Sequence, residues 1–154
     1  MPVRTGYVAT QSAGDVLTSA NFTKLPGGWI GYANVTANQT GITAITDLTN
    51  LTVTVTVGTN RLIQITGFGS ISTTANDNNG SLYVRESSTQ LARSQQWLDN
   101  TLVPTGTYVA CLLNAPSAGA HTYKLSLEAT ASAGLEAAST RPAFILVEDL
   151  GPSS

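Results

Sequence analysis

Apolar and polar residues alternate with a period of two along most of the chain from Trp29 onward. The clearest run covers residues 51–57, in which Leu and three Val share one face and three Thr share the other. This period predicts a β-strand with one buried face. Gly, Thr and Asn at 58–60 predict a turn after it. The run 61–66 then leads back antiparallel, so the two runs are predicted to form a hairpin.

Similar runs follow at short intervals, separated by segments rich in Gly, Asn, Ser and Pro. They predict strands at 81–86, 90–97, 107–114, 123–129 and 141–149, with turns at 87–89 and 115–120 and loops at 73–80, 99–106 and 131–140. A series of about eight short strands without a long helix predicts an all-β protein, an antiparallel β-sandwich or jelly roll. The last strand needs distant strands to bury it, which favours a Greek-key topology.

The closing strand differs from the others because it is apolar on both faces. Residues 144–147 are all apolar, and a strand of this kind must be covered from both sides. A domain of this size offers one core face, so we expect the second cover to be another copy of the protein. A second sheet within a monomer is the alternative. The predicted interface comprises Phe144, Ile145, Leu146, Val147, Trp29 and Tyr32.

Residues 1–25 show neither a period of two nor one of 3.6 over any length. They are small and polar with scattered apolar side chains, and a short helix after Asp15 or Thr18 is the most they predict. We therefore expect an extended N-terminal attachment arm at 1–25, followed by a β-domain at 26–154. The apolar residues of the arm that would dock are Val16, Leu17, Phe22 and Leu25.

Composition narrows the class of protein. At 154 residues the chain fits one domain. Only 10% of the residues are charged, against about 25% in ordinary soluble domains. The net charge of -2 offers no field that would gather phosphates, which disfavours nucleic-acid binding. No apolar run approaches the roughly 20 residues that a membrane span needs. The N-terminus lacks the apolar segment of a signal peptide, so we expect synthesis in the cytoplasm without export through a signal peptide.

Four motifs carry a resemblance. They are GDVLTSAN at 14–21, LPGGWIGY at 25–32, AGAHTYKL at 118–125 and RPAFILVEDLGP at 141–152. With the Thr- and Val-rich strands between them, the chain resembles small structural proteins of tailed bacteriophages, especially those of actinobacterial hosts, with a C1q/TNF-like jelly roll. The resemblance covers most of the chain. It implies a homotrimer whose last strand lies near the threefold axis, and it implies no catalytic residues.

Residues that usually carry catalysis or bind metals are few and scattered. His121 is the only histidine, and we expect it at the surface or at a strand edge. Three His121 side chains holding an ion on a trimer axis are the less favoured alternative. No Gly-x-Ser-x-Gly motif accompanies the histidine, so Ser-His-Asp catalysis is not expected. Cys111 lies in an apolar run without a neighbouring Lys, Arg or His, so its thiol is expected to be buried and inert.

The remaining patterns add no expected chemistry. The carboxylates are dispersed, and the loop at 76–80 lacks the alternating acids of a calcium-binding loop. Several Asn-x-Ser/Thr sequons occur, but such matches arise by chance in a chain rich in Asn and Thr. We therefore expect neither an enzyme nor a bound cofactor or metal.

The favoured function is that of a non-enzymatic virion protein, a trimer that decorates the capsid surface. Its expected partners are further copies of itself and other virion proteins, above all the major capsid protein. It would be made in the cytoplasm of the bacterial host. The alternative is a tail-fibre or minor tail module that binds a host surface glycan, with Trp97, the better candidate of the two Trp residues for an exposed position, as receptor contact. A third reading, an enzyme acting on cell-wall polymers, would need a carboxylate pair in a cleft.

Overall fold

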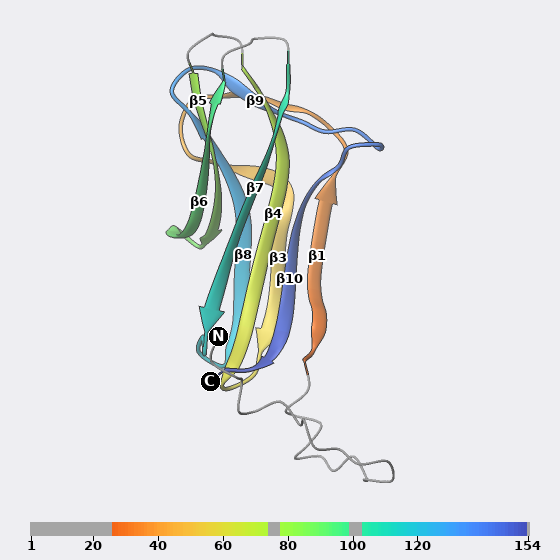
Figure 1. The fold of residues 1–154 in the computed structure, drawn as a ribbon, viewed down its shortest axis with the longest axis vertical. Helices are drawn as coiled ribbons and strands as arrows, with labels where there is room; N and C mark the ends of the chain where they lie inside the picture. The colour runs from red at the N-terminus through yellow and green to blue at the C-terminus, as the bar shows by residue number, and fades with distance from the viewer. Residues whose placement is uncertain (1–25, 74–77, 99–102, 154) are drawn as a thin grey trace.

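A computed structural model describes residues 26–73, 78–98 and 103–153. In these ranges the chain forms strands and no helix (Figure 1). The strands are β1 (Gly28–Val35), β2 (Gln39–Ile42), β3 (Thr46–Val57), β4 (Arg61–Thr73), β5 (Asn78–Glu86), β6 (Thr89–Leu98), β7 (Thr105–Asn114), β8 (Gly119–Ala129), β9 (Ala133–Glu136) and β10 (Ala143–Pro152). The predicted arm with Val16, Leu17, Phe22 and Leu25 lies outside the described residues.

The strands form two antiparallel sheets that pack face to face (Figure 1). The long strands of the first sheet follow the order β1-β10-β4-β7, and those of the second follow β3-β8-β5-β6. We call them the β4 sheet and the β8 sheet. Successive strands repeatedly cross from one sheet to the other, and the last strand returns to lie between the first and the fourth. This order is that of a jelly roll built from two Greek keys, so the predicted fold class is confirmed.

Short strands extend the β4 sheet beyond a break near one end. β10 pairs with residues 61–68 of β4. β9 lies in line with β10 and pairs with the following residues of β4, 70–73. In the same way, β2 lies in line with β1: β1 pairs with β10, and β2 pairs with β9. Residues 36–38 separate β1 from β2, and residues 137–142 separate β9 from β10. The prediction of a loop at 131–140 missed β9, which has only four residues.

The alternation in residues 51–57 is reproduced in the structure. The Leu and Val side chains of this run are buried, and the three Thr side chains are exposed. The predicted hairpin between this strand and 61–66 is wrong, however. β3 pairs with β8, whereas β4 pairs with β10 and β7. Residues 58–60 thus carry the chain from the β8 sheet to the β4 sheet instead of closing a hairpin. The second predicted turn, at 87–89, does join a hairpin, that of β5 and β6.

The core lies between the inner faces of the two sheets. Ile63 and Ile65 of β4 and Leu125 and Leu127 of β8 are among its fully buried side chains. The sheets approach so closely at Gly67 that an added Cβ would lie 2.3 Å from the Cδ2 atom of Leu125. Cores of this density tolerate neither added nor removed methyl groups without cost.

Candidate functional site

The outer face of the β4 sheet carries an unusual concentration of large apolar side chains. Strand register places residues in rows across β1, β10, β4 and β7, and cross-strand partners point to the same face of a sheet. Three such rows are Asn34–Phe144–Phe68–Tyr108, Tyr32–Leu146–Thr66–Ala110 and Trp29–Glu148–Gln64–Leu112. We call their large apolar members the aromatic face: Trp29, Tyr32, Phe68, Tyr108, Leu112, Phe144 and Leu146.

Ring contacts link most of this face. The ring centroids of Trp29 and Tyr32 are 6.3 Å apart, those of Tyr32 and Phe144 6.2 Å, and those of Phe144 and Phe68 5.8 Å. Such distances are typical of favourable aromatic pairs. Tyr108 follows Phe68 in register on the next strand. The side chains therefore form a continuous apolar band from the β1 edge of the sheet to the β7 edge.

Much of this apolar band is open to solvent. Trp29 is 71% exposed, and Tyr32, Tyr108 and Leu112 are each at least half exposed. Glu148 is the one charged residue in the three rows. Single exposed apolar residues are ordinary, whereas a contiguous patch with so little charge is typical of surfaces that contact another molecule.

The predicted interface residues divide between the two faces of the sheet. Phe144, Leu146, Trp29 and Tyr32 lie on the aromatic face. Ile145 and Val147 are 0% exposed because they point into the core against the β8 sheet, so for these two residues the interface prediction is wrong. β10, the strand that is apolar on both faces, is therefore covered within the protomer on its inner face only.

Sequence reasoning missed Phe68, Tyr108 and Leu112. A signal was present for the last two, since residues 107–113 are apolar at most positions on both faces, as 144–147 are. In the structure Thr107, Val109 and Cys111 point toward the core, and Tyr108 and Leu112 point outward. Phe68 carries no comparable signal because its neighbours on the outward face, Thr66 and Ser70, are polar.

The outer face of the β8 sheet is polar and charged. Asp47 on β3 accepts hydrogen bonds from the Nζ atom of Lys124 (2.7 Å), the Oγ atom of Ser126 (2.7 Å) and the Nη1 atom of Arg85 (3.1 Å). Desolvation alone would raise the pKa of Asp47, but these hydrogen bonds and the charges of Lys124 and Arg85 outweigh it, so the pKa is lowered. Thr54 and Thr122 share a hydrogen bond nearby. The cluster around Asp47 thus pairs its charges within one protomer.

His121 is buried, contrary to the expectation of a surface position. The residue is 8% exposed, its Nδ1 atom lies 2.6 Å from Glu86 Oε1, and its Nε2 atom lies 2.7 Å from the carbonyl oxygen of Ser117. Both partners are acceptors, so the doubly protonated ring satisfies both contacts. The Ser117 carbonyl, followed by Glu86, raises the pKa of His121 in spite of desolvation. In its doubly protonated form the ring has no lone pair to offer an ion.

The thiol of Cys111 is half-buried on the core side of β7, where burial raises its pKa to about 11. It is therefore protonated at neutral pH, as the apolar surroundings predicted. In the ranges that the structure describes, no three His, Cys, Asp or Glu side chains gather into a group that could hold a metal ion. Nor does any helix there have the length and apolar character to cross a membrane.

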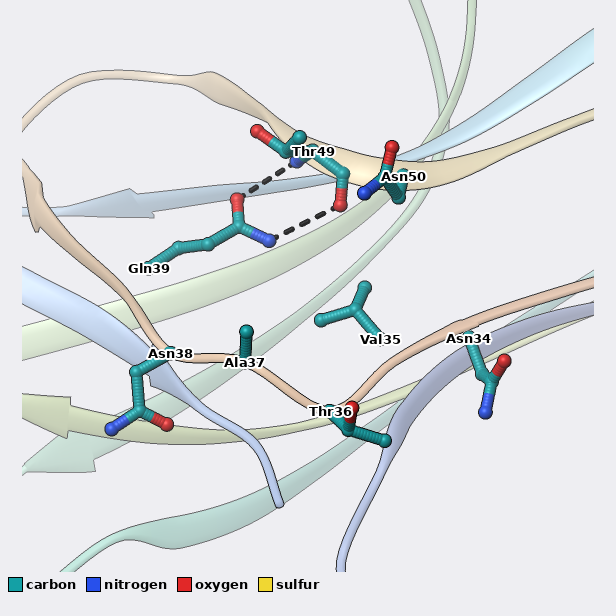
Figure 2. A pocket seen from close by; sticks show the side chains of 8 residues that line it. All are labelled: Asn34, Val35, Thr36, Ala37, Asn38, Gln39, Thr49 and Asn50. Carbon is teal, nitrogen blue, oxygen red and sulfur yellow. Dashed lines mark hydrogen bonds between the residues drawn. The ribbon is translucent and has the colours of Figure 1, made fainter. Parts of the chain in front are cut away.

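A pocket of about 450 Å³ lies at the break between β1 and β2 (Figure 2). The side-chain amide of Gln39 spans it, donating to the carbonyl oxygen of Thr49 (3.2 Å) and accepting from the Thr49 amide (2.8 Å). Asn38 donates to Glu136 Oε2 (2.6 Å) and accepts from the Ala137 amide (2.8 Å). The lining residues carry no ionisable group. These bonds hold the interrupted strands together.

Comparisons with known proteins give little beyond the fold. No protein-family model matches the chain, and no curated protein matches it. Among solved structures, the chain is similar to one described as "Structure of Eiger TNF from S. frugiperda", with 11% sequence identity and a TM-score of 0.41, over 82% of this chain and 96% of that one. A likeness at this level says nothing about function. The strand order alone defines the protein as an all-β jelly roll.

Proposed function

We propose that this protein is a non-enzymatic structural component of a bacteriophage particle, a homotrimer that decorates the capsid surface. The observation that carries the proposal is the aromatic face. Its ring chain and its exposed Tyr108 and Leu112 form a contiguous apolar surface with one charge in three rows. Burial of such surface stabilises an assembly by roughly 25 cal/mol per Å².

The geometry of the face supports a ring of identical copies. The apolar band reaches both edges of the sheet, with Trp29 and Tyr32 on β1 and Tyr108 and Leu112 on β7. An edge of one copy can therefore pack against the opposite edge of the next, which is the head-to-tail contact that closes into a ring. The resemblance to C1q/TNF-like jelly rolls favours three copies.

The particle assignment rests on the four motifs that resemble phage structural proteins. In this proposal residues 1–25 dock onto the major capsid protein, and the jelly roll is displayed. Decoration would then stabilise the shell by mass action, because a ligand that binds only the assembled state favours that state.

Light scattering on the purified full-length chain tests the assembly. A mass three times that of one chain is expected, and a monomer at micromolar concentration would overturn the trimer. Deletion of residues 1–25 should leave the trimer intact while abolishing its binding to undecorated particles. Cryo-electron microscopy of the particle gives the copy number: hundreds of copies indicate decoration, whereas a handful on the tail would contradict it.

A further inference from the structure

A second pocket, of about 440 Å³, lies on the outer face of the β8 sheet, on the opposite side of the sandwich from the aromatic face. Three strands contribute to it: β5, β6 and β8. Its side chains are polar throughout, apart from Ala129. Those that matter for binding are Asn79, Ser81, Arg93, Gln95, Glu128 and Thr130.

A carboxylate on β8 is held in place with one oxygen left available. The hydroxyl of Tyr83 donates to Glu128 Oε2. Glu128 Oε1 has no hydrogen-bond partner among the described residues, and no cation contacts it there. The Tyr83 bond therefore fixes the direction of a carboxylate whose second oxygen can accept a hydrogen bond from a ligand.

A guanidinium on β6 is positioned in a similar way. The Nε and Nη2 atoms of Arg93 donate to Ser81 Oγ at 3.1 and 2.9 Å, and its Cζ atom lies 5.5 Å from the centre of the Tyr83 ring. Within the described ranges Arg93 forms no ion pair. The Nη1 group has no partner there, so it can donate to a ligand. The cation–π contact and the Ser81 bonds hold the side chain over Tyr83.

An exposed indole lies on the same face of the sheet, outside the pocket lining and in register with Asn79, which lines it. Trp97 is the cross-strand partner of Asn79 and lies two residues from Gln95, so its side chain points to the same face as both. It is 57% exposed. The pocket supplies a fixed donor, a fixed acceptor and neutral amide groups, and the neighbouring Trp97 adds one flat apolar surface on the same face.

We propose that this pocket binds a neutral carbohydrate. The C–H face of a sugar ring would stack on Trp97, while hydroxyl groups would donate to Glu128 and accept from Arg93, Gln95 and Asn79. A phosphate or acidic sugar would meet the Glu128 carboxylate, and a cation would meet Arg93, so a neutral ligand with both donors and acceptors fits best. An apolar ligand would leave these groups unpaired at a cost.

The site deepens the proposed function without depending on it. If the aromatic face is buried between copies, the β8 sheet remains on the outside of the assembly and its pocket is presented to a glycan. From the sequence, Trp97 is the candidate receptor contact of the alternative function only, that of a tail module. Arg93 on β6 and Glu128 on β8 are brought together in the pocket only by the fold.

An array of neutral and acidic oligosaccharides, followed by isothermal titration calorimetry with the strongest neutral binder, tests the proposal. Trp97→Ala should weaken binding about tenfold or more, Glu128→Gln should weaken it severalfold, and Trp97→Phe should retain most of it. Thr56→Ala, on the same outer face but outside the pocket, is the matched control and should bind as the wild type does.

Three results would overturn the proposal: no binding of neutral oligosaccharides at millimolar concentration, binding only of acidic oligosaccharides or inorganic phosphate, or equal affinity in Trp97→Ala and Thr56→Ala. Thermal unfolding and light scattering on the same samples report folding and oligomeric state. A folded trimer without glycan affinity would thus contradict the pocket proposal alone, and a glycan-binding monomer would contradict the trimer alone.

Discussion

The two outer faces of the sandwich obey the same alternation but carry opposite chemistry. On the β4 sheet the outward positions hold Trp, Tyr, Phe and Leu, with Glu148 as the single charge in three rows. On the β8 sheet they hold Thr, Ser and the charged cluster around Asp47. Both sheets need one apolar face to build the core, and only the β4 sheet has a second. The second apolar face is surplus to folding, which is why we assign it to assembly.

The largest expected effect is on assembly. Tyr108→Asp combined with Leu112→Asp places two charges in the aromatic face, and burying them without partners is costly. We expect the trimer to dissociate to monomers. Light scattering measures the change, and Thr56→Asp on the opposite outer face is the control, which should remain trimeric. Dissociation of both variants, or of neither, would remove the distinction between the faces.

The next effect separates the two sides of one strand. Ile145→Ala removes fully buried atoms from the core and should lower the free energy of unfolding by about 2–5 kcal/mol. Leu146→Ala, one residue along and on the aromatic face, should cost less than about 1 kcal/mol in the dissociated Tyr108→Asp, Leu112→Asp background. Urea unfolding of both variants in that background measures the difference. Equal losses would show that the outer position contributes to the protomer's own core.

A smaller effect is expected on the polar face. Asp47→Asn weakens the contacts with Lys124 and Arg85, which are partly exposed and therefore worth about 1 kcal/mol or less. Because the folded pKa of Asp47 is lowered from 3.8, its contribution is present above pH 3.8 and is lost as the pH falls through the folded value. Urea unfolding at pH 7 and pH 3 should therefore show a smaller difference between the variant and the wild type at pH 3. An unchanged difference would contradict this role.

The smallest effect is the pH dependence from His121. Its folded pKa is raised above 6.5, so its stabilisation is complete below pH 6.5 and is lost as the pH rises through the folded value. No second histidine exists, and the pKa of Cys111 lies at about 11. The free energy of unfolding should therefore decline modestly from pH 6.5 to 9. His121→Gln should flatten this decline, and an unchanged slope would count against the Glu86 and Ser117 contacts.

The β-fold and its strands could be predicted because alternation is a local property. Residues 51–57 and the β5–β6 hairpin needed only neighbours in sequence to be recognised. The same pattern could not show that β3 and β4 lie in different sheets, since a turn at 58–60 serves a hairpin or a crossing equally well. The buried His121 was missed for a related reason, because its partner Glu86 is 35 residues away.

The sequence by itself determined that this chain is a β-sandwich with too many apolar positions on its closing strand. Tertiary structure decided which of those positions were surplus. Pairing of β10 between β1 and β4 placed Leu146 beside Tyr32 and Phe144 beside Phe68, and turned Ile145 and Val147 into the core. A period of two is set along one strand, whereas a surface is set across strands, and only folding brings the strands together.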